Sequence, residues 1–342
     1  MPITRGPLEQ WYRDPVSCLQ STLATLLLKA GEDPLVELGL DWEFRHIPGD
    51  VRPEEYYWPC RHPGDVVRSL LPHRAAVSRW RTVAGEDPLA VLEDALAAGL
   101  LPVIAVDNFH LPFRPAYHDV HAAHLLVVYE VDREAGTVGV SDAQPPAFLG
   151  PIPVADLLRS WDDASPHDDQ DVFFSGKGET AARRWLEVRL DEPGPELDPG
   201  QLGTVLRANV RGFTNPAERD GTHQVGLEGL RGFTDDLVER SRDGGSEALV
   251  SAYTFGWGMQ AQAALHGELL RRCGAGWGMR ELAEAGRHAE LVAHLWSGVR
   301  VQSAHGRADP AGCARELARH AALLVAAYER ALETIDRVAE GL

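Results

Sequence analysis

The sequence predicts an α+β fold in its N-terminal part, followed by a mainly α-helical domain. Three observations support this prediction: an amphipathic helix near the N-terminus, apolar runs of strand length joined by turn residues, and a long C-terminal region with helical periodicity. A segment rich in Pro, Gly and acidic residues, Asp191–Gly200, separates the two parts. We therefore divide the 342 residues into a domain at 1–190 and a helical domain at 201–342.

The first helix is expected within Asp14–Gly31. Its apolar residues fall on one helical face: Leu19, Leu23, Leu26, Leu27 and Ala30. Ser17, or Asp14 one turn earlier, supplies the N-cap, and Gly31 ends the helix. Cys18 then lies in the first turn, where free N–H groups and the helix dipole favour a thiolate. The alternative interpretation is a small residue that packs at a helix start.

The other elements of this domain are assigned from periodicity, length and turn residues. Helical segments are expected at the start of Leu35–His46, which ends in strand-like residues, and at Asp65–Leu71, Asp87–Ala98 and Val154–Ser160. Strands are expected at Leu101–Asp107, His124–Val131, Thr137–Ser141, Asp171–Phe174 and Trp185–Leu190. Continuous apolar strands are typical of a sheet that is buried on both faces.

Aromatic residues gather around a predicted loop at Pro48–Pro63. They either line an acyl or pantetheine channel or pack in a core, and they are Trp42, Phe44, Tyr56, Tyr57 and Trp58. In the second domain, helices are expected at Gly200–Val210, Gly226–Arg240, Glu247–Cys273, Met279–Gly298 and Pro310–Gly341. The glycines at 254–260 and 273–279 are expected to let helices approach closely or to end them.

Composition excludes some classes of partner. The formal net charge is −18, from 51 acidic and 33 basic residues, which argues against nucleic acid or an anionic membrane as the partner. We find no signal-peptide pattern and no apolar run that approaches ~18 residues, so we expect a soluble, cytoplasmic protein. The four cysteines are scattered, which indicates free thiols in a reducing compartment. Three of them are interpreted as structural: Cys60, Cys273 and Cys313.

A second informative segment spans Asp107–Asp142. His124 opens a predicted strand, and Asp142 ends the next one after a tight turn. Adjacent antiparallel strands would bring Asp142 beside His124, where its carboxylate can accept the Nδ1–H of the imidazole. A cysteine at a helix start, a histidine on one strand and an acid on the neighbouring strand form a papain-type arrangement, in the chain order Cys, His, Asp. The sequence therefore predicts a catalytic triad of Cys18, His124 and Asp142.

Two other interpretations apply to the same segment. It contains closely spaced groups of metal-ligand type: Asp107, His110, His118, Asp119, His121 and His124. Their spacing matches no established zinc or iron motif, so we assign no metal ligand. His110, His118 and His121 are instead interpreted as residues of a solvated loop that form local hydrogen bonds.

The sequence also resembles a known family. DPVSCLQSTLATLLLKAG, followed by ELGLDWEF, VIAVDNFHLPF, HAAHLLVVYEVD and VGVSD, is similar to the butirosin-biosynthesis protein H type of acyltransferase over roughly residues 8–180. The resemblance implies a papain-like N-terminal domain, of the type found in bacteriocin-processing peptidases, and a helical domain after it. From Gly226 to Leu342 the resemblance rests on GLEGLRGFTDDL and FGWGMQAQAALHGELL.

This resemblance implies the nucleophile at Cys18, the histidine at His124 and the acid at Asp142. It implies transfer of an acyl group from the phosphopantetheine thioester of a carrier protein, through an acyl-enzyme, to a small-molecule amine, with no cofactor bound by the protein itself. Related peptidases carry an oxyanion-hole Gln before the Cys, but Tyr12 stands at that position. Gln10 is then a weak candidate, and the Cys18 backbone N–H is a better one.

Asp107 and Asn108 follow a core strand and are weak candidates for binding a substrate amine; strand-end capping is the alternative. Two rival functions remain. The same triad would also serve a thioesterase, cyclase or peptidase, and a papain-like domain without catalysis would serve as a binding protein, with or without a metal. The helical domain is expected to contact a carrier protein, the substrate or a second copy of the chain in a homodimer.

Overall fold

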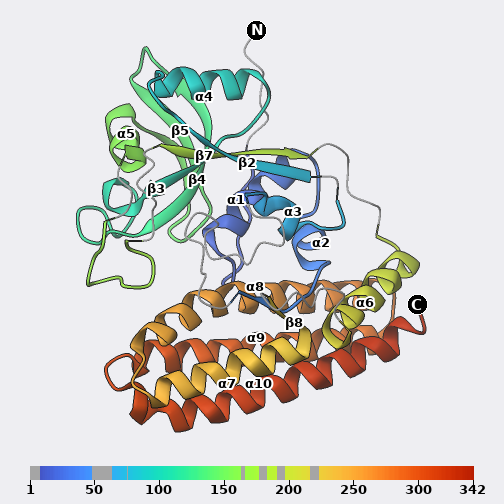
Figure 1. The fold of residues 1–342 in the computed structure, drawn as a ribbon. Helices are drawn as coiled ribbons and strands as arrows, with labels where there is room; N and C mark the ends of the chain where they lie inside the picture. The colour runs from blue at the N-terminus through green and yellow to red at the C-terminus, as the bar shows by residue number, and fades with distance from the viewer. Residues whose placement is uncertain are drawn as a thin grey trace. The chain divides into compact units, whose positions relative to one another are not determined.

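The computed structural model describes residues 8–47, 64–74, 76–162, 166–176, 183–190, 197–215 and 223–342. The chain forms two compact units, and most of their elements are labelled in Figure 1. The first unit contains the described residues up to Pro34 and from Gly64 to Leu190, and the second contains residues 35–47 and the described residues from Leu197 onward. None of the helices in these ranges has the length and apolar character needed to cross a membrane.

A six-stranded antiparallel sheet forms the centre of the first unit. Its strands are β2 (Ala76–Thr82), β3 (Val103–Asp107), β4 (Ala123–Asp132), β5 (Thr137–Asp142), β6 (Phe148–Pro153) and β7 (Arg184–Leu190). The strand order is β2-β7-β3-β4-β5-β6, so β3 to β6 follow one another and β7 returns between β2 and β3. The α+β prediction is confirmed, although the sequence analysis assigned no strand to β2 or β6.

Helices cover this sheet. They are α1 (Cys18–Lys29), α3 (Val66–Leu70), α4 (Pro88–Ala97) and α5 (Val154–Asp162). Alternate residues of β3, β4 and β5 pack with α4 and α5 in one core: Ile104, Val106, Leu126, Val128, Val138, Val140, Leu92, Leu96, Leu157 and Trp161. The intervening Leu125 and Val127 are also fully buried, in the strand that α1 contacts. Burial on both faces explains the continuous apolar runs.

The expected strand at Asp171–Phe174 is wrong, because this segment forms a turn. The carboxylate of Asp171 accepts hydrogen bonds from the N–H groups of Phe173 (3.0 Å) and Phe174 (3.1 Å). The Asp171 carbonyl accepts a further bond from the N–H of Ser175 (3.0 Å). An aspartate that bonds the backbone two and three residues ahead stabilises a turn and competes with strand pairing.

The second unit consists mainly of long helices, with α7 to α10 lying side by side (Figure 1). Its elements are α2 (Pro34–Gly39), β1 (Arg45–His46), α6 (Pro199–Thr214), β8 (Gln224–Val225), α7 (Gly226–Arg242), α8 (Ser246–Gly276), α9 (Arg280–Gly306) and α10 (Pro310–Ala339). The segment at 35–47 belongs to this unit because it packs among the helices: β1 pairs with β8, and the Leu40 carbonyl accepts a bond from the Asn209 amide (3.2 Å).

An aromatic core holds the second unit together. Trp42 and Phe44 are each 1% exposed, and their rings contact Phe213, Phe233, Phe255, Trp296 and Tyr328. They are therefore core residues and not the lining of a channel. The other aromatic candidates for that lining, Tyr56, Tyr57 and Trp58, lie outside the described residues, as do the predicted loop at Pro48–Pro63 and most of the predicted linker.

Candidate active site

Cys18 is the first residue of α1. Ser17 caps the helix: its hydroxyl accepts a hydrogen bond from the N–H of Gln20 (3.3 Å), and the Gln20 side chain accepts one from the N–H of Ser17 (3.1 Å). This reciprocal capping box fixes the helix start at Cys18, as the sequence predicts with Ser17 as the N-cap. The thiol is half-buried and forms no disulfide. Its backbone N–H is one of the four that a helix leaves without an internal acceptor.

His124 and Asp142 come from neighbouring strands. β4 and β5 pair in antiparallel register, with Val127 opposite Ser141, which places Asp142 within reach of the start of β4. The Nε2 of His124 lies 2.7 Å from the Oδ2 of Asp142, and the two side chains are 5% and 1% exposed. The structure thus brings these two predicted residues together in a buried ion pair.

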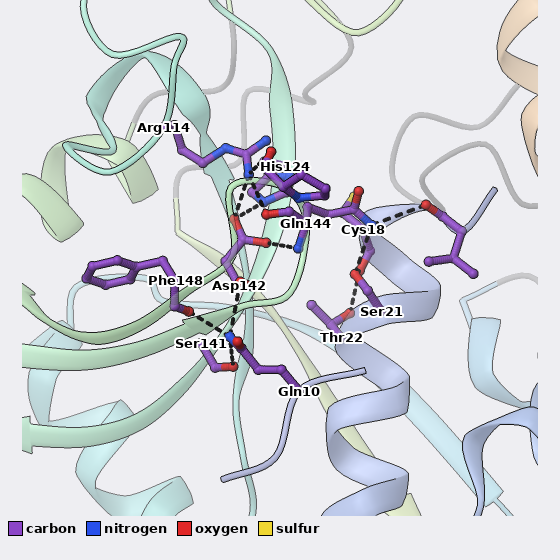
Figure 2. Close-up of polar contacts among 12 residues, drawn as sticks. Gln10, Cys18, Ser21, Thr22, Arg114, His124, Ser141, Asp142, Gln144 and Phe148 are labelled. Carbon is purple, nitrogen blue, oxygen red and sulfur yellow. Dashed lines mark hydrogen bonds and ion pairs between the residues drawn. The ribbon is translucent and has the colours of Figure 1, made fainter. Parts of the chain in front are cut away.

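The His124 side chain also forms a hydrogen bond with Cys18. Since Nε2 faces Asp142, the nitrogen that remains for the thiol is Nδ1. This corrects the expectation that Asp142 bonds to Nδ1 of His124. Figure 2 shows Cys18, His124 and Asp142 pointing toward one another from three different elements.

Two residues that the sequence analysis missed hold Asp142 in place. Arg114 donates from Nη1 to Oδ2 of Asp142 (3.2 Å) and to the carbonyl of Gln144 (3.2 Å). The N–H of Gln144 donates to Oδ1 of Asp142 (3.0 Å). Arg114 lies in the segment between β3 and β4, 28 positions before Asp142, and no sequence pattern predicts its contact with that residue.

Gln144 also connects this acid to the helix that carries the thiol. Its Nε2 donates to the carbonyl of Val16 (3.1 Å) and to the hydroxyl of Ser21 (3.1 Å), which come before and after Cys18 in the chain. One residue therefore contacts Asp142 through its backbone and the start of α1 through its side chain. This arrangement fixes the separation of the acid and the cysteine.

The charges at this site favour a protonated histidine. Burial lowers the pKa of His124, but the charge and hydrogen bond of Asp142, together with the hydrogen bond of Cys18, raise it to about 9. Burial alone would raise the pKa of Asp142, but the charge and hydrogen bond of His124 and the charge of Arg114 lower it below its usual value. An imidazolium beside a carboxylate is the expected state at neutral pH. Such a ring can stabilise a thiolate on its other side.

The weaker candidates have other roles in the structure. Gln10 donates from Nε2 to the hydroxyl of Ser141 (3.0 Å) and to the carbonyls of Asp142 (3.1 Å) and Phe148 (2.7 Å). Its amide nitrogen is therefore bound to β5 and β6 and does not supply an oxyanion hole. Asn108 is buried, and its Oδ1 has no hydrogen-bond partner among the described residues.

Asp107 does not offer a free carboxylate to an amine. Its Oδ1 accepts bonds from the N–H groups of Phe109 (3.0 Å) and Ala122 (3.1 Å), and its Oδ2 lies 2.6 Å from Nδ1 of His121. All of these partners belong to the protein, so the capping alternative describes Asp107 correctly. His121 is no simple loop residue either, because it is paired to a fully buried carboxylate.

The remaining candidates do not form a second nucleophile or a metal centre in the described residues. No group of three or more His, Cys, Asp or Glu side chains there has a geometry that would hold a metal ion. Cys273 is buried, and Cys313 lies 3.2 Å from the carbonyl of Pro310. Cys60 falls outside the described residues.

Residues 17–143 match a family model described as "Butirosin biosynthesis protein H, N-terminal". The match contains the whole of α1 and the strands β3, β4 and β5, and hence Cys18, His124 and Asp142. No curated protein matches the chain.

Proposed function

We propose that this chain, whose residues 17–143 belong to the butirosin biosynthesis protein H N-terminal domain family, is a cysteine-dependent acyltransferase of antibiotic biosynthesis. Its nucleophile is Cys18, its acid–base residue is His124 and its orienting acid is Asp142. The observation that carries the proposal is the His124 imidazole, bonded through Nε2 to Asp142 (2.7 Å) and through its other nitrogen to Cys18. This is the geometry of an activated thiol nucleophile.

The first half-reaction forms an acyl-enzyme. In the resting site the proton of Cys18 is held by His124 as the imidazolium, and the thiolate attacks the carbonyl carbon of a carrier-protein thioester. The backbone N–H of Cys18, at the positive end of α1, stabilises the oxyanion that forms. The carbon–sulfur bond of the donor then breaks, and His124 returns its proton to the departing pantetheine sulfur. Exchange of one thioester for another is nearly isoenergetic, so the site mainly has to supply the thiolate.

The second half-reaction transfers the acyl group to an amine. The neutral amine nitrogen attacks the carbonyl carbon on Cys18, the carbon–sulfur bond breaks, and the nitrogen loses one proton to His124 to become an amide. Cys18 leaves as the thiolate beside the imidazolium of His124. The resemblance of the sequence to butirosin-biosynthesis protein H type acyltransferases supports transfer to an amine over release to water.

Intact-protein mass spectrometry tests this proposal. The chain is mixed with an acyl-N-acetylcysteamine thioester or an acylated carrier protein, first alone and then with a primary amine. We expect one acyl adduct on Cys18 that disappears as an amide product forms. The Cys18→Ala variant should form no adduct, and Cys313→Ala, the matched control in the helical unit, should react like the wild type.

Three outcomes contradict the proposal in different ways. Adduct formation by Cys18→Ala, or no adduct on the wild type, excludes Cys18 as the acyl carrier. An adduct that is released only to water, whatever the amine concentration, indicates a thioesterase. A cyclic product that forms without added amine indicates a cyclase.

A further inference from the structure

A second histidine–carboxylate pair lies in the same unit as the proposed triad. The Nδ1 of His121 lies 2.6 Å from the Oδ2 of Asp107. The Asp107 side chain is 0% exposed, whereas that of His121 is 23% exposed. Two backbone N–H groups fix the other oxygen of Asp107, so the carboxylate has one orientation. The pair therefore has a buried, fixed acid and a ring that reaches the surface.

The ring of His121 is held in a defined orientation. The Phe109 ring stacks on it at 4.1 Å between centroids and an interplanar angle of 11°. The backbone N–H of His121 donates to Oδ2 of Asp168 (3.0 Å), and the carboxylate of Asp168 also accepts a bond from the N–H of Gln170 (2.9 Å). Such support is typical of a histidine with a chemical role, because it fixes a ring nitrogen in space.

The carboxylate also decides which nitrogen can accept a proton. A neutral imidazole that donates Nδ1–H to Asp107 carries its lone pair on Nε2. No described residue forms a hydrogen bond with this Nε2. This lone pair is therefore left for a bound molecule, on a side chain that is 23% exposed.

This pair lies at the same end of the sheet as the proposed triad. Asp107 ends β3 and pairs with Ala123, which precedes His124 in β4. His121 is three residues before His124, and three residues span at most about 11 Å even when fully extended. The backbones of His121 and His124 therefore lie within about 11 Å of each other, at the end of the sheet where the acyl group on Cys18 would form.

We propose that His121, oriented by Asp107, binds the acceptor amine of the acyl transfer through Nε2 and removes its first proton. This inference rests on the proposed function. Its chemical basis is that an alkylammonium ion must lose two protons to become an amide: one before the nitrogen can attack, and one from the tetrahedral adduct. His121 takes the first and releases it to solvent. The second goes to His124, which restores the imidazolium beside the Cys18 thiolate, so protons and charges balance.

The test separates the two half-reactions. An acyl-N-acetylcysteamine thioester loads Cys18, and the acyl-enzyme is then mixed with ethanolamine, which is protonated at neutral pH, or with hydroxylamine, which is not. For the His121→Asn variant we expect amide formation from ethanolamine to fall by about 10- to 100-fold relative to the loading rate, within the range of general-base effects. The reaction with hydroxylamine should change by less than about threefold, since it needs no first deprotonation.

Two further variants complete the test. His118→Asn makes the same change in a neighbouring residue of the aromatic cluster that has no carboxylate partner in the described residues, and it should behave like the wild type. Asp107→Asn, a change to a positioning residue, should lower the ethanolamine rate in the same direction as His121→Asn. Thermal unfolding checks that each variant is folded.

The remaining outcomes contradict either this inference or the proposed function. If His121→Asn slows ethanolamine and hydroxylamine equally, or slows the loading of Cys18 as much as the transfer, His121 is only structural and the inference is wrong. If the wild type is never acylated, the proposed function fails instead. If the wild type is acylated but forms no product with either amine, the transferase proposal fails, and the inference fails with it.

Discussion

At the residue scale, the Asp142 carboxylate connects the parts of the candidate site. It accepts hydrogen bonds from His124, Arg114 and the N–H of Gln144, and it is 1% exposed. A buried carboxylate is costly unless each oxygen has a donor, and here both oxygens have one. Arg114 matters because, within the described part of the chain, it is the one partner of Asp142 with a full charge besides His124, and it also lowers the pKa of that histidine. Its removal should therefore affect both the position and the basicity of the ring.

Arg114→Ala is expected to slow acylation of Cys18 by roughly 10-fold, because the carboxylate loses a charged hydrogen bond of about 1.5–3 kcal/mol. Arg114→Lys should recover part of the rate, since a lysine supplies the charge without the forked geometry. The measurement is the rate of adduct formation from an acyl-N-acetylcysteamine thioester. Arg159→Ala, which removes an arginine with a 68% exposed side chain, is the control. Equal rates for Arg114→Ala and the wild type would show that the backbone bond from Gln144 suffices.

At the element scale, the packing of α8 against α9 depends on two glycines. A Cβ atom added to Gly286 would lie 2.5 Å from the carbonyl oxygen of Gly267, and one added to Gly267 would lie 2.6 Å from that of Gly286. Distances this short require a backbone shift, since neither contact is with a flexible side chain. The two helices therefore touch backbone to backbone at this point.

Gly286→Ala is expected to destabilise the second unit by about 1–3 kcal/mol, despite the better helix propensity of alanine. The control is Gly212→Ala in α6, where a new Cβ meets nothing within 4 Å. That change should be neutral or stabilise by up to about 1 kcal/mol. Chemical denaturation followed by far-UV circular dichroism measures both. A Gly286→Ala variant as stable as the control would mean that the helices separate at no cost.

At the scale of the whole molecule, the two units contain buried histidines with opposite pKa shifts. The Nδ1–H of His266 in α8 donates a hydrogen bond to the carbonyl of Gly39 (2.8 Å). Burial lowers the pKa of His266 to about 4, against the effect of this bond. In the first unit, the neighbours of His124 raise its pKa to about 9 despite its burial.

The two shifts predict opposite dependences of stability on pH. A histidine whose pKa is lowered in the folded state contributes fully to the free energy of unfolding above about pH 6.5, and this contribution is lost as the pH falls toward 4. A histidine whose pKa is raised in the folded state contributes fully to the free energy of unfolding below about pH 6.5, and this contribution is lost as the pH rises through 9. A change of about 2.5 in pKa corresponds to on the order of 3 kcal/mol. Acid should therefore weaken the helical unit, and alkali the sheet unit.

Calorimetric unfolding between about pH 4.5 and pH 9.5 measures this behaviour. His266→Gln, which keeps a donor for the Gly39 carbonyl, should reduce the pH dependence of the unfolding temperature on the acid side only. Asp142→Asn removes the charge that raises the pKa of His124 and should flatten the alkaline side only. His294→Gln, at an exposed position of α9, is the control for the loss of a histidine. Flattening of both sides by either variant would show that other groups dominate the profile.

Features that depend on neighbours within a few positions could be predicted from the amino-acid sequence. The start of α1 at Cys18 follows from Ser17 and Gln20, and the apolar runs of β3, β4 and β5 follow from local composition. The order of Cys18, His124 and Asp142 was enough to predict which side chains would meet. Their catalytic roles stay a prediction that the acylation experiment tests.

Features that depend on contacts between distant residues became visible only in the folded chain. In the fold, Nε2 of His124 bonds to Asp142, and Arg114 donates to the same carboxylate. Gln10 donates to Ser141, and residues 35–47 pack among the helices of the second unit. The fold also makes His121 a partner of a buried carboxylate instead of a solvated loop residue. Periodicity and capping act over about one helical turn, whereas these contacts are set by how whole strands and helices pack, and a single sequence carries no local signal for them.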